Sequence, residues 1–173
     1  PWLSTGVQDA EITCDPGLLG GRDVVVFESL RKDGAEVASH ADLSDEGQTV
    51  NVAVEVSTQA ADAADGDQVI EAGKAKVVDT VAYKGLVPGE TYIAVGTLMD
   101  KGTGEPFLDK DGNEVTARTP FEPEAPSGTV EVTFEFDTEG LAEGDELVVF
   151  EKVLDSAGNV VATHEDIDSA EQS

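Results

Sequence analysis

The chain has 173 residues, 37 of them acidic and 10 basic, and its net charge of −27 repels nucleic acids and anionic membranes, so neither is expected as a partner. The single cysteine, Cys14, excludes an internal disulfide, and no Cys/His cluster has the spacing of a metal site, so we expect no metal and no other cofactor. We recognise no signal peptide, bilayer-spanning run or anchoring tail in the sequence, and we expect any surface localisation to depend on parts outside it.

The sequence repeats itself with a period of about 124 residues. The segment Asp-Val-Val-Val-Phe-Glu at 23–28 returns as Glu-Leu-Val-Val-Phe-Glu at 146–151. In both copies a Gly-containing turn follows, then a histidine, and eight residues later a glutamine: His40 with Gln48, and His164 with Gln172. A fixed period of this kind indicates tandem structural units.

The period divides the chain into two unequal parts. Residues 1–49 are predicted to be the C-terminal part of a first immunoglobulin-like repeat, whose N-terminal strands are absent. Residues 50–173 are predicted to be a complete second repeat.

In the second repeat, runs rich in β-branched residues are separated by turns that contain Gly, Asn and Asp. The predicted strands, in chain order, are 52–58, 76–83, 91–98, 114–119, 128–136, 146–153 and 159–164. The Ala-rich stretch 59–65 is interpreted as a loop because it ends in Asp-Gly. Seven short strands in such a length predict an all-β fold, an immunoglobulin-like antiparallel β-sandwich in tandem repeats.

Several polar residues fall on the apolar faces of these strands, because side chains alternate with a period of two. They are Thr58, Asp79, Glu151, His164 and, in the first copy, Glu28. Glu135, in contrast, lies on an outward face. A buried carboxylate without a partner is costly, so Asp79 and Glu151 are expected to be paired, to share a proton or to have a function.

Each of these residues also has an ordinary explanation. An inward threonine is usually hydrogen-bonded in the core, a histidine near a strand end is usually exposed or satisfied, and an inward glutamate is often paired for structural reasons. The combination of all three with a glutamine at a fixed spacing, repeated twice, favours a functional site.

These motifs resemble the VaFE repeats of Gram-positive surface adhesins. The resemblance lies in the Val-Val-Phe-Glu strand, Asp79-Thr-Val, Gly85-Leu-Val-Pro-Gly89, Gly96-Thr-Leu-Met-Asp100, and His164-Glu-Asp-Ile-Asp before Gln172. It covers nearly all of residues 52–173 and the C-terminal part of the pattern in 1–49. The family forms an intramolecular ester bond between a threonine and a glutamine.

The resemblance implies a role for each residue. Thr58 would be the nucleophile and Gln172 the acyl donor, assisted by three catalytic residues, Asp79, Glu151 and His164. Their counterparts in the first repeat would be Glu28, His40 and Gln48. The reaction would be a single autocatalytic turnover, so the protein would not be an enzyme.

The resemblance also implies a setting for the module. It would be a structural stalk module of a secreted, cell-wall-anchored bacterial adhesin. Its partners would be neighbouring repeats of the same protein, and a host ligand would bind through other domains.

Other functions remain open from the residues alone. The segment could be a plain or isopeptide-linked adhesin domain that binds a host protein, which would require inward lysines or an exposed binding patch. A hydrolase built on Thr58 or His164 would require an open pocket. The segment 109–114 resembles part of a calcium loop but is interpreted as a hairpin turn. Cys14 is predicted to be a core residue.

Overall fold

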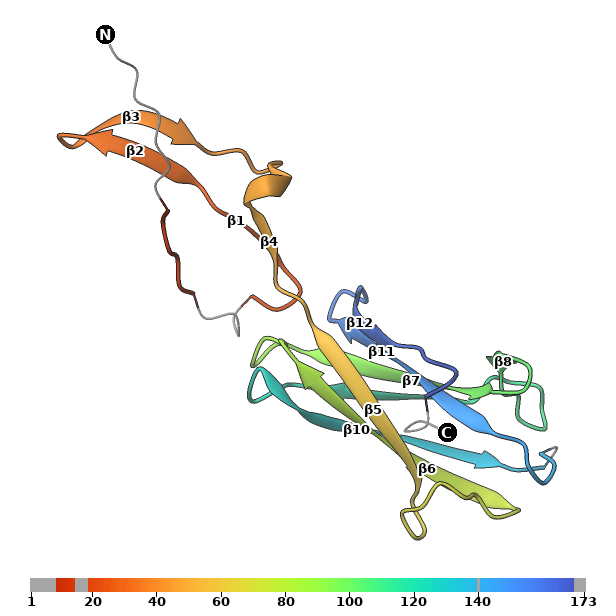
Figure 1. The fold of residues 1–173 in the computed structure, drawn as a ribbon. Coiled ribbons are helices and arrows are strands. Elements are labelled where there is room, and N and C mark those ends of the chain that lie inside the picture. Colours follow the sequence, from red (N-terminus) through yellow and green to blue (C-terminus); the bar gives the residue numbers. More distant parts are fainter. Residues whose placement is uncertain (1–8, 15–18, 140, 170–173) are drawn as a thin grey trace.

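The computed structural model describes residues 9–14, 19–139 and 141–169, and its regular elements there are strands and one short 3-10 turn (Figure 1). The second unit is built from two antiparallel sheets. The first sheet has the order β10-β6-β5, and the second has β7 at its centre. The predicted all-β immunoglobulin-like sandwich is confirmed.

The first sheet is formed by three strands: β5 (Glu55–Asp62), β6 (Lys74–Lys84) and β10 (Ser127–Asp137). In the second sheet β11 and β12 lie on one side of β7, while β8 and β9 both pair with its other side. The bounds are β7 (Tyr92–Asp100), β8 (Glu105–Pro106), β9 (Thr116–Phe121), β11 (Leu147–Asp155) and β12 (Val160–His164). The edge strands β5 and β12 of the two sheets are in contact, so the first and last described strands of this unit lie side by side.

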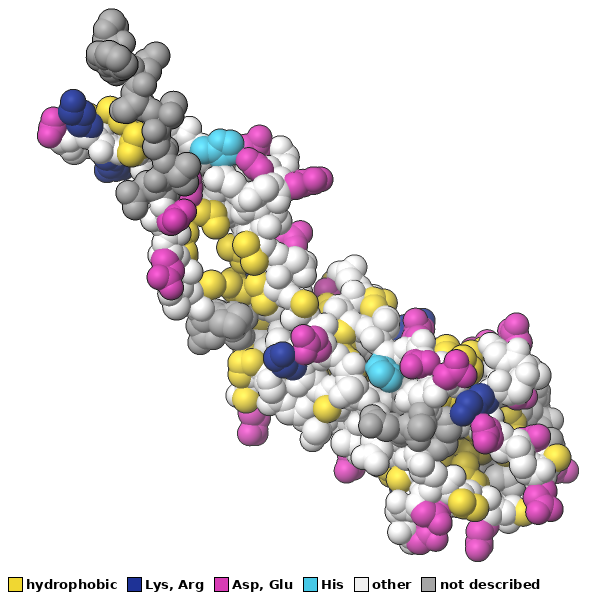
Figure 2. Space-filling view, viewed as in Figure 1, with side chains coloured by type: hydrophobic (Ala, Val, Ile, Leu, Met, Phe, Trp, Pro, Cys, Tyr) yellow, Lys and Arg dark blue, Asp and Glu magenta, His cyan; other side chains and the backbone are white. Residues whose placement is uncertain are grey.

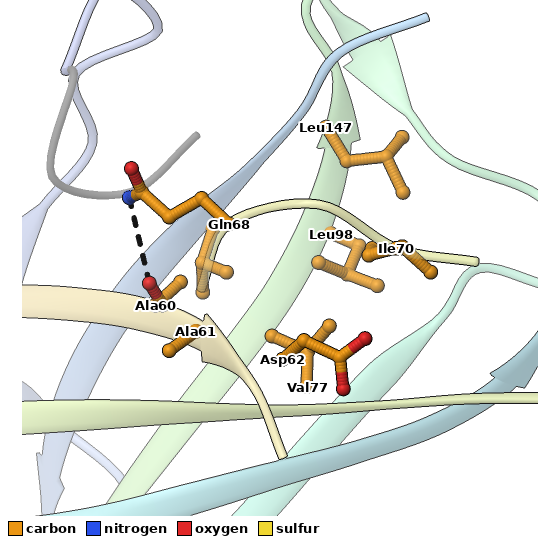
Figure 3. Close-up of a pocket in the computed structure, with 9 residues that line it drawn as sticks. Ala60, Ala61, Asp62, Gln68, Ile70, Val77, Leu98 and Leu147 are labelled. Carbon is orange, nitrogen blue, oxygen red and sulfur yellow. Dashed lines mark hydrogen bonds between the residues drawn. The ribbon is translucent and has the colours of Figure 1, made fainter. Parts of the chain in front are cut away.

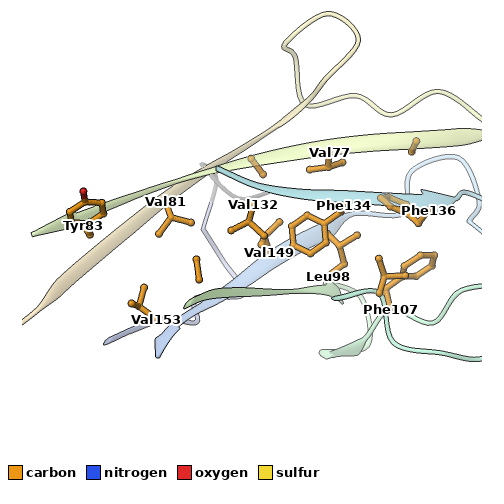
Figure 4. Close-up of a cluster of buried hydrophobic side chains, with 14 of the residues drawn as sticks. Val77, Val81, Tyr83, Leu98, Phe107, Val132, Phe134, Phe136, Val149 and Val153 are labelled. Carbon is orange, nitrogen blue, oxygen red and sulfur yellow. The ribbon is translucent and has the colours of Figure 1, made fainter. Parts of the chain in front are cut away.

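The core lies between the two sheets (Figure 4). Alternate residues of β6, β7, β10 and β11 point into it, as the period-two pattern predicts. Its largest fully buried apolar side chains are Phe134, Leu86 and Leu98. Phe107 packs edge to face on Phe136, with ring centroids 5.7 Å apart.

The described part of the first unit is two small ladders joined end to end. They are formed by β1 (Asp23–Val25) with β4 (Thr49–Asn51), and by β2 (Glu28–Lys32) with β3 (Ala35–His40), with a 3-10 turn, η2 (Glu46–Gln48), before β4. None of the described residues between 9 and 51 is buried. Apolar side chains that would face a core are exposed, among them Phe27 at 53% and Leu30 at 65%. Figure 2 shows apolar atoms at this end and acidic side chains spread over both units.

All seven predicted strands are present, with ends that differ by a few residues. The interpretation of 59–65 as a loop is wrong for its first half, because residues 59–62 continue β5 and pair with 77–80 of β6. Counting by two from the inward-facing His164 predicts that Val160 also faces inward, but Val160 is 54% exposed, because a bulge opposite Val153 and Leu154 shifts the register of β12. Cys14 is exposed instead of buried, since the described part of its unit has no core.

Candidate functional site

Three polar side chains lie in the core of the described sandwich: Thr58, 4% exposed, and Asp79 and Glu151, both 0% exposed. All three were predicted to face inward by the alternation of their strands. Glu135, predicted to face outward, has a side chain that is 73% exposed and lies 3.4 Å from the ammonium group of Lys76. The strand phases assigned from the sequence are therefore correct at these positions.

The strand pairing brings Thr58 and Asp79 to neighbouring places on one sheet face. Thr58 lies opposite Val81, and Asp79 lies opposite Ala60, two residues further along β5. The two side chains are thus diagonal neighbours in the β5–β6 ladder, where such positions are roughly 7 to 8 Å apart. Because the same face points into the sandwich, both side chains are shielded from water.

The carboxyl groups of Asp79 and Glu151 meet across the two sheets. Asp79 comes from β6 of the first sheet and Glu151 from β11 of the second. All four carboxyl oxygens are buried, and none has a donor in good geometry among the described residues when both groups are ionised. A proton on one carboxyl supplies the missing hydrogen bond to the other, as expected for two acids in a dry site.

The electrostatics decide which carboxyl keeps the proton. Burial, and then the charge of Asp79 beside it, raise the pKa of Glu151 to about 9. Burial also raises the pKa of Asp79, to about 6, while the hydrogen bond with Glu151 and the charge of His164 oppose that shift. At neutral pH Glu151 is therefore the protonated partner and donates to Asp79. Two acids whose pKa values are pushed apart form a usual arrangement for general acid catalysis.

His164 stands beside this pair at the end of β12. It lies directly opposite Glu151 in the β11–β12 ladder and is half-buried. Directly opposite residues place their side chains on the same face, about 5 Å apart at Cβ. The imidazole thus lies near the acid pair at the border between the core and the surface.

Gly96 adjoins the site, although the sequence motifs gave it no role there. It is buried in the middle of β7, and it lies opposite Glu151 in the β7–β11 ladder. The available signal was a lone glycine inside an apolar strand, which often marks a close approach of other atoms.

Gln172 lies outside the described residues, which end at Ser169. The turn after His164 is described, and it repeats the turn after His40. In each copy the carboxylate of the aspartate two residues past the histidine accepts a hydrogen bond from the backbone N–H two residues further on, at 2.9 Å for Asp42 and 3.1 Å for Asp166. The backbone carbonyl oxygen of the same aspartate accepts a hydrogen bond from the N–H three residues further on. The N–O distance is 3.3 Å from Asp45 to Asp42 and 3.1 Å from Ser169 to Asp166.

The first-repeat counterparts keep the same register but not the same burial. Glu28 lies opposite His40, as Glu151 lies opposite His164, yet both residues are exposed. His40 Nε2 lies 2.6 Å from the carboxylate of Asp45. The backbone oxygen of Gln48 accepts from the N–H of Val26 at 3.0 Å, and its side-chain Oε1 is buried with no partner among the described residues.

An isopeptide bond would require a lysine that faces inward, but four lysines of the second unit point to solvent. Lys74 is exposed, and three others form surface ion pairs: Lys76 with Glu135 at 3.4 Å, Lys84 with Glu55 at 3.0 Å, and Lys152 with Glu165 at 3.0 Å. Such exposed pairs contribute little to stability.

The described residues contain no group of three or more His, Cys, Asp or Glu side chains that could hold a metal ion. In the segment 109–114 the Asp109 carboxylate accepts from the backbone N–H groups of Asp111 and Asn113, both at 2.9 Å, which closes a hairpin turn. Nor does the described part of the chain contain a helix long and apolar enough to cross a membrane.

A small apolar pocket adjoins the site (Figure 3). Ala60, opposite Asp79, and Val149, two residues before Glu151, both line it, together with Ile70 and Leu98. Its internal volume is about 30 Å³, enough for one or two molecules of the size of water. A pocket of this size does not admit a substrate of the kind that a hydrolase would cleave.

Fold and site together define a class of protein: immunoglobulin-like sandwiches that hold a threonine and an acid pair in their core. The family model of the T-Q ester bond containing domain matches the chain at residues 4–52 and again at 54–173. The chain therefore belongs to this family, and the ester-bond resemblance predicted from the motifs is confirmed.

Solved structures add a similarity of fold. Two crystal forms of a bacterial adhesin from Mobiluncus mulieris, described as containing intramolecular disulfide, isopeptide and ester bond cross-links, each match with a TM-score of 0.56 and 18% identity. The match covers 69% of this chain and 55% of the adhesin chain, so this chain spans about half the length of that protein. No curated protein matches the sequence.

Proposed function

We propose that the second unit joins Thr58 to Gln172 by an ester bond, which it forms once and on itself. The observation that carries this proposal is the buried Asp79–Glu151 acid pair, placed next to a buried threonine in a chain of the T-Q ester bond family. Such a pair is costly in a purely structural core, and it has the protonation that amide activation requires.

The geometry of Gln48 in the first unit supports the proposed position of Gln172 in the second. Gln48 follows the same aspartate turn and pairs with Val26 of the Val-Val-Phe-Glu segment. Val149 is the equivalent of Val26 in the second copy. A glutamine that followed the same path would pair beside Val149, two residues from Glu151 on the inward face of β11. That position is close to β5, because β5 contacts both β11 and β12.

The reaction is a transfer of an acyl group from nitrogen to oxygen. The Oγ1 of Thr58 attacks the amide carbon of Gln172, a new C–O bond forms, and the C–N bond breaks. The hydroxyl proton ends on the departing nitrogen, which leaves as ammonia. His164 acts as the base that takes this proton and passes it on, because a threonine hydroxyl is a weak nucleophile at neutral pH.

The acid pair serves the carbonyl side of the reaction. Before the attack the Glu151 proton is hydrogen-bonded to Asp79, which holds Glu151 in position. As negative charge develops on the amide oxygen, this proton turns from Asp79 to that oxygen. The dry core strengthens this interaction, and the fixed strands supply a high effective concentration of the two reactants. The small pocket lined by Ala60 and Val149 has room for the ammonia that is released.

The product is a covalent cross-link between the first strand of the unit and its C-terminal segment. A bond of this kind would resist unfolding and extension, which suits a stalk module of a bacterial surface adhesin anchored to the cell wall. The similarity to a cross-linked bacterial adhesin from Mobiluncus mulieris supports the adhesin part of this setting. The partners are then neighbouring repeats of the same protein, with any host ligand bound by other domains.

The intact mass of the purified chain tests the proposal. The wild-type mass is expected to fall below the sequence mass by one ammonia. Thr58→Ala is expected to restore the full mass, and Thr58→Ser, which keeps a hydroxyl, is expected to retain the loss. A folded wild-type chain with the full sequence mass would refute the ester bond and leave a plain immunoglobulin-like spacer.

A further inference from the structure

We propose that Gly96 is a positioning residue for the cross-linking reaction, because the absence of a side chain at this position makes the room in which the Glu151 carboxyl sits. The inference rests on the proposed function. It adds a residue of β7 to the site.

The space around Gly96 is already filled by the site. A Cβ built on its backbone would overlap Oε1 of Glu151 and Cζ of Phe134, and it would lie 3.1 Å from Cδ of Glu151. All three atoms belong to side chains, so the crowding comes from the functional carboxyl and the core beside it.

The backbone gives no other reason for a glycine here. Gly96 lies within a regular ladder, paired with Glu151 of β11 on one side and Ala117 of β9 on the other. It is not among the described glycines with a positive φ, so an L-amino acid fits its backbone conformation. Glycine in a strand interior costs stability, and this cost requires a compensating role at the position.

The surroundings determine what a larger residue would displace. Phe134 is 1% exposed and lies in the middle of the core between the two sheets (Figure 4). The Glu151 carboxyl is the far end of a more flexible side chain. A methyl group at position 96 would therefore displace the carboxyl from the position that it now holds beside Asp79. A displacement of about 1 Å in a catalytic group costs roughly 100-fold in rate.

The test compares Gly96→Ala with Gly128→Ala in freshly synthesised chains, with the loss of ammonia followed over time by mass spectrometry. Gly128 is the matched control, because a Cβ there would also crowd the core, 2.5 Å from the Tyr83 hydroxyl oxygen, but away from the acid pair. We expect Gly96→Ala to cross-link at least about 10-fold more slowly than wild type, and Gly128→Ala to stay within about threefold. A folded Gly96→Ala chain that cross-links at the wild-type rate would overturn the assignment.

Two further arms keep the test decisive. If Gly96→Ala does not fold, adding Phe134→Leu removes the ring contact. The double variant should then cross-link more slowly than Phe134→Leu alone, and equal rates would overturn the assignment.

If wild type forms no ester, the proposed function fails. The role of Gly96 is then tested by the pKa of Glu151, measured by NMR in Thr58→Ala chains. Adding Gly96→Ala should lower that pKa by about one unit or more, because the displaced carboxyl gains water and moves from Asp79. An unchanged pKa would refute the role of Gly96.

Discussion

Removal of the Thr58 hydroxyl should cost the second unit much of its stability. In Thr58→Val the side chain keeps its branched shape in a site that is 4% exposed, so the packing volume is retained, and the loss of the hydroxyl itself costs about 1 kcal/mol. The ester bond is lost. Since the bond between residues 58 and 172 closes a loop of 114 residues, the chain-entropy relation for cross-links gives a loss of about 5 kcal/mol. For a unit of this size the melting temperature should fall by roughly 15 to 20 °C.

The assay is urea and thermal unfolding of wild type, Thr58→Val and Thr58→Ser, each with its intact mass measured. Thr58→Ser keeps the hydroxyl, so it is expected to lose ammonia and to remain close to wild type in stability. The reasoning would be refuted by a Thr58→Val chain that lacks the bond and yet unfolds within about 1 kcal/mol of a cross-linked wild type.

Three further predictions concern the assisting groups. His164→Ala should leave the fold intact and slow ammonia loss by roughly 10² to 10⁴-fold; an unchanged rate would remove this histidine from the mechanism. Glu151→Gln should impair cross-linking far more than Glu135→Gln, since only Glu151 is buried beside Asp79, and equal effects in the same mass assay would contradict the site. In the Thr58→Val chain the free energy of unfolding should fall as pH rises from about 4 to about 9, because the folded acid pair retains protons that the unfolded carboxyls release near their ordinary pKa values. Urea unfolding should show a smaller decline between pH 6 and 9 when Glu151→Gln is added, and an identical decline would argue against a buried proton.

The inward carboxylates could be predicted from the sequence because strand periodicity is local. Counting by two along 76–83 and 146–153 was enough to place Asp79 and Glu151 on the core face. That the two groups meet each other depends on how one sheet lies on the other, and no pattern within a strand carries that information. The role of Gly96 was missed for the same reason, since the atoms that fill its space come from β10 and β11.

The errors of the sequence reading have physical causes as well. The Ala-rich stretch after Thr58 has weak strand propensity, but pairing with β6 extends the strand to Asp62. Val160 was placed on the wrong face because a bulge in the β11–β12 ladder interrupts the alternation. The division at residues 49 and 50 stays a prediction.

The most direct test of the central claim is a search for the joined peptides after proteolysis of the wild-type chain. The ester predicts one cross-linked pair that contains Thr58 and Gln172, lighter by one ammonia than the sum of its parts, and a Gln48 peptide that keeps its amide. The same digest of Thr58→Ala should contain the two peptides separately. Recovery of unlinked Thr58 and Gln172 peptides from a folded wild-type chain would contradict the account.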